Sequence, residues 1–431
     1  MLKREIENQL IQWKNKEDKK CLIISGARQV GKTYIVEKFG KENYENFVEL
    51  NFIENPTFMK IFDGDLSIDT ILSNISLYAP EQPKLIPHKT LIFFDEIQSC
   101  PKARTALKFF AIDKRFDVIA SGSLLGINYS EVPSYPTGYV EFLEMYPLSL
   151  KEFLWANGVD DNIISIIKKC FDNKTKVDCA INAKLLEYFK KYIVVGGMPN
   201  VVNSFIRNHD YEEVLTIQRN ILIDYQNDIA KYAVSTEKVK AKACFNSIPG
   251  QLAKENKKFI YRQFDKNGKT SKYEGSINWL IDAGIVNICN NLKLLDIPLI
   301  AYKDELNFKL YMADTGLLVS MLDNGTNIQI IEGNLGIYKG AIFENIVAQI
   351  LKNKGEKLYF YNRNNSLEID FVLSKNTKVI PIEVKANNNK AKSLSTILKE
   401  NPNMQGIKLI DGNVGIVGNM VTLPLYMCMF L

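Results

Sequence analysis

The apolar residues of segment 1–120 follow two alternating patterns, one typical of helices and one typical of buried strands. Ile6, Leu10 and Trp13 lie at helical spacing, and a second helix is predicted after the glycine at position 31. Short apolar runs, each long enough for one strand, predict strands at 21–24, 47–51, 91–94 and 116–120. Because strands alternate with helices, this segment is predicted to form a parallel α/β sheet.

The pattern changes after Leu143, where helical spacing prevails to about residue 320, with turn signals at 196–199 and 267–268. Beyond Gly333, a helix is predicted at 341–351, and strand-like segments follow at 358–361, 369–373 and 379–384. A chain of 431 residues is too long for one hydrophobic core, since single cores stop growing near roughly 250–300 residues. The predicted fold class is therefore multidomain α/β, with domains at 1–142, 143–234, 235–332 and 333–431.

Composition and charge exclude several classes of function. With 54 Lys and Arg against 49 Asp and Glu, the net charge of +5 drives no global attraction to nucleic acid or to a membrane. Two histidines leave little room for His-based catalysis, and the seven cysteines form no C-x-x-C pair, which argues against a disulfide framework or a zinc site. No apolar run approaches the 18 residues of a membrane span, and the N-terminus lacks a signal-peptide pattern. We therefore expect a cytoplasmic protein without membrane contact.

The sequence GARQVGKT fits the phosphate-binding pattern G-x-x-x-x-G-K-[ST], and it lies between a predicted strand and a predicted helix, as that pattern requires. Its glycines let backbone N–H groups surround phosphates, and the following helix N-terminus adds positive potential. The lysine is expected to reach the β- and γ-phosphates of ATP, and the threonine hydroxyl to bind Mg²⁺. The predicted nucleotide site comprises Gly26, Ala27, Arg28, Gln29, Val30, Gly31, Lys32 and Thr33.

Two later strands carry polar residues suited to the same site. The run Leu91–Phe94 ends in Asp95 and Glu96, where Asp95 is the candidate Mg²⁺ ligand and Glu96 the candidate base for the attacking water. The strand 116–120 ends in Ser121 and Ser123, either of which could sense the γ-phosphate. Together these residues extend the prediction from ATP binding to Mg²⁺-dependent ATP hydrolysis.

The segments GARQVGKT, LIFFDEIQ, IASGS and MYPLSLKEFL resemble a prokaryotic family of AAA-like ATPases with a C-terminal domain that resembles restriction-type nucleases. Further similarity lies at GGMPNVV, at IPGQLA, at YMADTGLL and at EIDFVL, so it covers nearly the whole chain. The resemblance implies an AAA/RecA-like P-loop sheet, a helical region with a winged helix, and a restriction-endonuclease-like α/β domain. One departure is Tyr139 after Gly138, where related chains often carry arginine. Arg28 could replace that arginine at the γ-phosphate or could pack against the helix.

The family's winged helix corresponds to residues 235–312, with its recognition helix at 275–280 and a wing opening at 285–289. Basic and aromatic residues are interleaved upstream of that helix, a mixture that suits phosphate contact with base stacking. A solvated basic face around core aromatics explains the same residues, since Glu255, Asp265 and Glu274 interrupt the positive run. The basic residues are Lys254, Lys257, Lys258, Arg262, Lys266, Lys269 and Lys272, and the aromatic ones are Phe259, Tyr261, Phe264 and Tyr273.

The last domain carries Glu344, Asp370, Glu383 and Lys385 in the order of the PD-(D/E)xK nuclease core. In that chemistry carboxylates such as Asp370 and Glu383 bind metal ions while a lysine positions the nucleophile. Glu383 and Lys385, two residues apart on a strand, face the same side. The same acids could instead serve salt bridges or partner binding.

Two functions follow. In the first, ATP hydrolysis moves or gates a nuclease-like module acting on DNA or another nucleic acid. In the second, the chain is an ATP-dependent signalling or assembly switch whose last domain only binds a partner. A second copy of the chain is also a candidate partner, since AAA-like sites commonly take an arginine from a neighbouring subunit.

Overall fold

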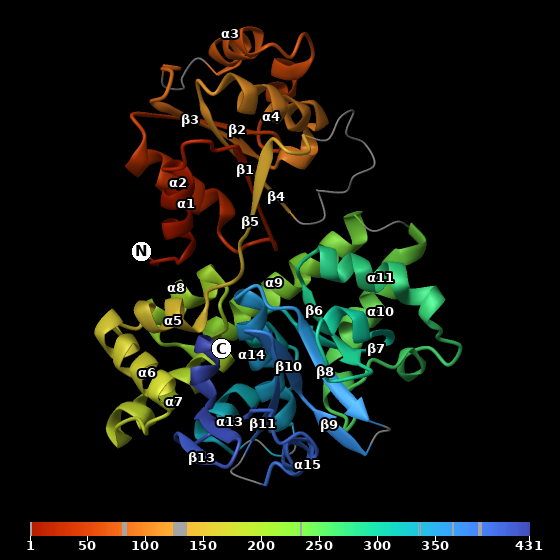
Figure 1. Cartoon of the computed structure of the whole chain (residues 1–431). Coiled ribbons are helices and arrows are strands. Elements are labelled where there is room, and N and C mark those ends of the chain that lie inside the picture. Colours follow the sequence, from red (N-terminus) through yellow and green to blue (C-terminus); the bar gives the residue numbers. More distant parts are fainter. Residues whose placement is uncertain are drawn as a thin grey trace. The chain divides into compact units, whose positions relative to one another are not determined.

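The protein forms two compact units in its computed structural model (Figure 1). The first unit contains residues 3–146 with 282–284, and the second contains residues 1–2, 147–281 and 285–431. The structure describes residues 2–79, 84–123, 136–232, 235–334, 336, 338–363, 366–386 and 390–431. Within these ranges no helix is long and apolar enough to cross a bilayer.

The first unit is built on a five-stranded parallel sheet with the order β2-β3-β4-β1-β5. This confirms the parallel sheet predicted for the N-terminal segment. The edge strand β5 escaped the prediction because its residues are half-buried or exposed and include two glutamates, so it lacks a continuous apolar run. The strands are β1 (Cys21–Gly26), β2 (Asn46–Asn51), β3 (Thr90–Asp95), β4 (Asp117–Ser123) and β5 (Val140–Glu144).

Helices cover both faces of this sheet, and the strand pleat sends neighbouring residues into different cores. Phe93 packs in the core beneath α1 and α2, whereas Phe94 packs in the opposite core beneath α3 and α4. In that second core, Phe94 makes edge-to-face contacts with Phe62 and Phe110. The covering helices are α1 (Ile6–Lys14), α2 (Lys32–Asn43), α3 (Ile68–Tyr78) and α4 (Pro101–Asp113), with the short 3₁₀ helix η1 (Pro56–Phe62).

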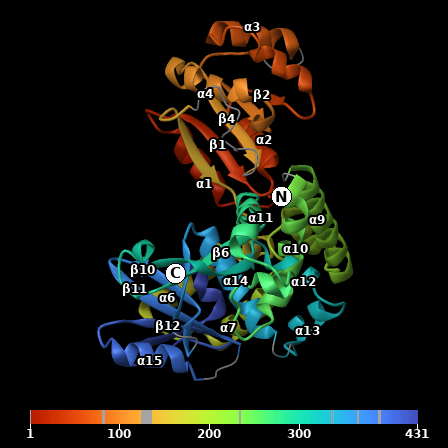
Figure 2. The same cartoon turned by 90° about the vertical axis from the view of Figure 1, so that its right-hand side faces the viewer.

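The second unit begins with helices and continues into two sheets (Figures 1 and 2). One sheet has the order β7-β6-β8-β9 and the other β10-β11-β12-β14-β13. The helices are α5 (Leu150–Ala156), α6 (Asp161–Asn173), α7 (Cys179–Val195), α8 (Pro199–Asn208), α9 (Tyr211–Tyr232), α10 (Ser235–Leu252), α11 (Thr270–Asp282), α12 (Thr315–Ser320), α13 (Thr326–Glu332), α14 (Lys339–Asn353) and α15 (Lys392–Glu400). The strands are β6 (Val286–Leu292), β7 (Lys303–Met312), β8 (Leu358–Arg363), β9 (Leu367–Ile369), β10 (Phe371–Lys375), β11 (Lys378–Lys385), β12 (Gly406–Ile410), β13 (Gly415–Val417) and β14 (Met420–Pro424).

The division of this unit differs from the three domains expected at 143–234, 235–332 and 333–431. Strand β8, from the third of these segments, pairs in parallel with β6 from the second, and Cys289 lies opposite Leu358. The second and third segments therefore share one sheet. The local apolar pattern carries no trace of this pairing, because it joins strands far apart in the sequence. Helices α10 and α11 are followed by the antiparallel pair β6–β7, which is the element order expected of a winged helix.

Two glycine-containing segments, 196–199 and 311–318, meet around the buried carboxylate of Asp314. Its Oδ2 accepts a hydrogen bond from the Gly197 amide at 2.6 Å, and its Oδ1 accepts one from the Leu317 amide at 3.0 Å, which caps α12. A Cβ on Gly197 would lie 2.4 Å from the Leu148 carbonyl oxygen, and one on Gly316 would lie 2.6 Å from the Gln218 side chain. These segments thus hold helices of the second unit together.

We predict that Gly197→Ala destabilises the second unit by about 1–3 kcal/mol, because the added methyl group overlaps a backbone carbonyl in a packed interior. Urea unfolding of the full chain, followed by far-UV circular dichroism, measures the effect. Gly340→Ala is the matched control, since a Cβ there meets no atom within 4 Å and alanine suits the helix α14. Equal unfolding midpoints for the two variants would contradict the proposed crowding at Gly197.

Candidate functional site

The loop between β1 and α2 has the backbone of an anion-binding turn. Gln29 and Gly31 adopt left-handed conformations, with φ of 65° and 93°, a pattern in which successive N–H groups form concavities for anions. A Cβ at Gly26 would lie 2.2 Å from the Met145 carbonyl oxygen, so only glycine fits there. Arg4 supports the loop from outside, since its guanidinium donates to the carbonyls of Val30 at 3.1 Å and Tyr146 at 2.7 Å.

Lys32 begins α2 and folds back over this loop. Its Nζ donates to the carbonyl oxygens of Gly26 at 3.0 Å and Ala27 at 2.8 Å. Burial lowers the pKa of Lys32 to about 8, and the nearby charges of Glu96 and Asp95 only partly offset that effect. The structure therefore holds a lysine side chain in the loop with carbonyl oxygens as its hydrogen-bond partners.

Asp95 contacts, through its side chain, residues at the ends of the two neighbouring strands and at the start of α2. Its side chain is almost fully buried, and its Oδ2 accepts from the Thr33 hydroxyl at 2.9 Å and from the Asn51 amide at 3.1 Å. Its Oδ1 accepts from the Ser121 hydroxyl. Since β2, β3 and β4 are adjacent parallel strands, their carboxyl ends bring these groups to one edge. Sequence reasoning missed Asn51, although it is the last residue of β2.

Glu96 follows Asp95 in a left-handed conformation, with φ of 53°. Such strain in a non-glycine residue is often found at functional sites. The Gln98 side chain donates to Glu96 Oε2, and a Cβ on Gly122 would lie 2.8 Å from Gln98 Oε1. The absence of a side chain at Gly122 thus leaves room for Gln98, which positions Glu96. Neither Gln98 nor this role of Gly122 was predicted.

For Arg28 and Ser123, two further predicted nucleotide-site residues, the structure gives fewer contacts. Arg28 is half-buried in the loop, and its charge lowers the pKa of Lys32. The backbone of Ser123 pairs with Gly26 in the β1–β4 register, but its side chain lies outside what the structure describes. Ser121 is therefore the serine that the geometry connects to Asp95.

The second unit brings its predicted carboxylates into one buried cluster. Glu344, on α14, accepts hydrogen bonds from Lys257 Nζ at 2.7 Å and from the Tyr311 hydroxyl at 3.1 Å. Asp370, between β9 and β10, accepts from the Val384 amide at 2.7 Å. Burial raises the pKa of Asp370 to about 7, and the negative charge of Glu344 adds to the shift.

Glu383 and Lys385 lie at the end of β11. Glu383 Oε1 forms an ion pair with Lys385 at 2.6 Å, and its Oε2 accepts from the Leu394 amide in the first turn of α15 at 3.0 Å. The pKa of Lys385 is raised chiefly by its hydrogen bond to Glu383, and further by the charges of Asp370 and Glu344, while burial opposes the shift. Lys385 is therefore the residue that interacts electrostatically with the other three.

Two lysines that sequence reasoning did not assign to this cluster neutralise it. Lys309, on β7, is fully buried and forms ion pairs with Glu368 at 2.6 Å and Glu344 at 3.6 Å. Lys257 was grouped with surface cations available to nucleic acid, but its side chain is only 14% exposed and faces Glu344. Among the residues that the structure describes, no three His, Cys, Asp or Glu side chains are arranged to hold a metal ion.

Three of the four aromatic residues of the basic stretch, Phe259, Tyr261 and Tyr273, are buried, and Phe264 is half-buried. Phe259 stacks on Phe308 with an interplanar angle of 15°, and Tyr261 stacks on Tyr273 at 20°. Their faces are thus already covered by other aromatic rings. This packing supports the interpretation of a solvated basic face around core aromatics more than that of a base-stacking surface.

Comparisons with protein families identify the first unit. The model of an AAA domain matches residues 18–154, which include the loop, Asp95 and Ser121. This segment is an AAA-like P-loop ATPase domain, and ATP binding and hydrolysis are the activities that the match indicates. Models of two domains of unknown function, DUF8612 and DUF4143, match residues 186–327 and 339–426.

Similar whole chains include an uncharacterized protein of Methanocaldococcus jannaschii, 23% identical over 427 residues, covering 97% of this chain and 85% of that protein. Another, from Haemophilus influenzae, is 25% identical over 384 residues, covering 87% and 84%. Among solved structures, a Walker-type ATPase of Pyrococcus abyssi has a TM-score of 0.44 at 12% identity, covering 74% of this chain and 96% of that one. The Orc1 protein of Aeropyrum pernix in complex with DNA has a TM-score of 0.30 at 12% identity, covering 77% and 92%. Both structural similarities are too weak for the properties of those proteins to be assigned to this chain.

We predict that ATP binding takes up protons between about pH 8 and 9, because bound phosphates raise the pKa of Lys32 from its value of about 8. Affinity for ATP should accordingly fall as the pH rises through this window. Calorimetric titrations at pH 8.5 in two buffers of different ionisation enthalpy measure the uptake. Lys32→Arg is the control, since its guanidinium stays charged throughout and should show none. Equal uptake in both proteins would refute the assignment to Lys32.

Proposed function

We propose that this chain is a Mg²⁺-dependent ATPase whose nucleotide state controls its second unit. The observation that carries the proposal is the set of donors around Asp95, where Thr33, Asn51 and Ser121 meet beside Lys32. A buried carboxylate next to a hydroxyl and a lysine, at the end of a phosphate-binding loop, is the arrangement that phosphoryl transfer from ATP requires.

The residues at this site suit Mg²⁺, a hard cation that prefers oxygen ligands. Thr33 Oγ1 and Asp95 Oδ2 lie 2.9 Å apart, so the hydroxyl and the carboxylate would hold the cation together. Bound there with ATP, Mg²⁺ would offset the negative charge of the phosphates.

The other side chains have separate roles in this proposal. Lys32 exchanges the carbonyls of Gly26 and Ala27 for the β- and γ-phosphates. Glu96 orients the attacking water and takes its proton, and Gln98 positions Glu96 through their hydrogen bond. Ser121 senses the γ-phosphate through Asp95. A cationic group at the γ-phosphate comes from Arg28 or from a second copy of the chain.

Glu96→Gln is expected to keep ATP binding and to slow hydrolysis by about 10²–10⁴-fold, because an amide cannot accept the proton of the water. Phosphate release measures turnover, and fluorescence titration with a labelled ATP measures binding. Glu17→Gln, which changes an exposed acid of the same unit, should leave both unchanged. Undiminished hydrolysis by Glu96→Gln would remove Glu96 from its role.

For the second unit we infer a restriction-endonuclease-like core. The convergence of Glu344, Asp370, Glu383 and Lys385 supports this fold, as does the strand order in which β10, β11 and β12 follow α14. An ATP-controlled nuclease acting on DNA is one function that this set of residues suits. The winged-helix order of α10, α11 and β6–β7 suits contact with the same substrate.

One observation favours the alternative, a partner-binding switch. Lys257 and Lys309 form ion pairs with Glu344, while backbone amides donate to Asp370 and to Glu383. The carboxylates that would hold catalytic metal ions are thus already occupied by protein groups. We therefore propose that the second unit binds a partner and does not cleave nucleic acid.

Purified full-length protein should leave single- and double-stranded DNA and RNA intact in the presence of Mg²⁺ or Mn²⁺ and ATP. Gel electrophoresis of labelled substrates measures cleavage, and Asp370→Ala is the matched control for a contaminating nuclease. Metal-dependent cleavage by the wild type that disappears in Asp370→Ala would overturn the switch and establish the ATP-controlled nuclease.

A further inference from the structure

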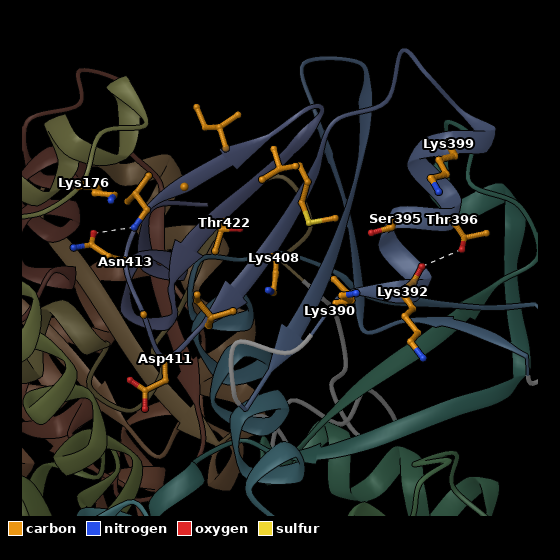
Figure 3. Close-up of a pocket in the computed structure, with 18 residues that line it drawn as sticks. Lys176, Lys390, Lys392, Ser395, Thr396, Lys399, Lys408, Asp411, Asn413 and Thr422 are labelled. Atoms are coloured by element: carbon orange, nitrogen blue, oxygen red, sulfur yellow. Dashed lines mark hydrogen bonds between the residues drawn. The ribbon is translucent and has the colours of Figure 1, made fainter.

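The second unit contains a cavity of about 900 Å³ that is lined by residues of this unit alone and was not foreseen from the sequence. It is bounded by α15, by β12 and β14, and by the segment 411–417 (Figure 3). Five of its lining residues are lysines, against a single carboxylate. These charged residues are Lys176, Lys390, Lys392, Lys399, Lys408 and Asp411.

Lys408 is the deepest of these cations by burial, with 8% of its surface exposed. It lies on β12 opposite Glu383 of the neighbouring strand, so its backbone position is fixed by the sheet. Figure 3 shows Lys408 near the middle of the lining residues, between Lys390 on one side and Asn413 on the other. A lysine held in a sheet and withdrawn from solvent gives a fixed charge for an anion, unlike a mobile surface lysine.

The wall carrying Lys176 is brought to the cavity from a distant part of the chain. Asn413 Oδ1 accepts from the Val177 amide at 3.0 Å, and Asn413 Nδ2 donates to the Val177 carbonyl at 2.8 Å. Asn182 Nδ2 also donates to the Gly412 carbonyl at 3.2 Å. These paired contacts fix the backbone next to Lys176 beside the sheet. The side chains of Lys176, Lys390, Lys392 and Lys399 are themselves exposed at the rim of the cavity, whereas Lys408 is buried.

The rest of the lining is mixed in character. Ser395, Thr396 and Thr422 supply hydroxyl groups, while Ile410 and Met420 supply apolar surface. Small-molecule sites typically enclose roughly 300–1,000 Å³ and combine apolar walls with a few polar or charged groups. The volume and the lining therefore match a compact ligand that carries both negative charge and an apolar ring.

We propose that this cavity binds a phosphorylated small molecule of nucleotide size, at a site distinct from the P-loop. Its phosphates contact Lys408 and Lys390, and its ring lies on the apolar surface of Ile410 and Met420. A long nucleic acid is the less suitable ligand, because Lys408, the cation at the centre of the lining, is withdrawn from solvent with 8% of its surface exposed. The proposal is independent of ATP hydrolysis, since none of its residues belongs to the first unit.

The test uses the full-length chain carrying Lys32→Ala, so that the P-loop does not compete for the probes. Calorimetric titration with ADP and with inorganic triphosphate should reveal one site, with ADP bound more tightly because its base adds apolar contact. Lys408→Met, and separately Lys390→Gln, should each weaken binding by about tenfold or more, since each removes a charge-assisted contact. Lys357→Gln, which alters an exposed lysine outside the cavity, should leave affinity unchanged.

Thermal melting shows whether the substitution of the buried Lys408 impairs folding. If it does, the exposed variant Lys390→Gln still tests the proposal. The proposal is overturned if neither ADP nor triphosphate binds at concentrations up to about 1 mM, since a dissociation constant above that value is very weak binding. It is also overturned if Lys390→Gln binds as tightly as the parent. Tight binding of a 20-nucleotide single strand without binding of ADP would assign the cavity to nucleic acid instead.

Discussion

The first unit depends on one buried carboxylate at the end of a central strand. Asp95 is 2% exposed, and an ionised carboxylate in such a position is tolerated only when hydrogen bonds replace its lost hydration. Thr33, Asn51 and Ser121 provide those bonds, and each comes from a different element. The same contacts that make the charge tolerable therefore fix the loop, α2 and the ends of three strands relative to one another.

The buried acids of the second unit are stabilised by cations in addition to neutral donors. Lys257 and Lys309 approach Glu344 at hydrogen-bonding or ion-pair distance, and Lys309 is itself fully buried. Removing one partner of such a buried pair leaves an uncompensated charge, which is why these groups are structurally costly to change. In the first unit the carboxylate keeps hydroxyl and amide partners that a hydrated cation can replace. In the second unit, lysines form ion pairs with Glu344 and Glu383, and this difference is the physical basis for proposing different roles.

Sequence patterns predicted the features that depend only on residues close together in the chain. The P-loop, the buried run ending at Asp95, and the E-x-K pair at Glu383 and Lys385 are local, and the structure places each on the expected kind of element. Asn51 and Arg4 could not be found in this way, because their roles depend on which strands are neighbours and on how the chain returns to the loop. Gln98 is only two residues from Glu96, but nothing in the local pattern shows that its side chain turns back to that carboxylate. Lys257 looked like a surface cation because its partner Glu344 lies far along the chain. The pairing of β6 with β8, which joins two expected domains, was hidden for the same reason.

The most direct test of the central claim is steady-state phosphate release from ATP by the wild type and by Asp95→Asn, with and without Mg²⁺. Asparagine preserves the size of the side chain but removes the charge. The account predicts Mg²⁺-dependent turnover by the wild type and a loss of about 10²–10³-fold in Asp95→Asn, in line with the removal of one electrostatic element from an active site. Hydrolysis by Asp95→Asn at the wild-type rate would contradict it.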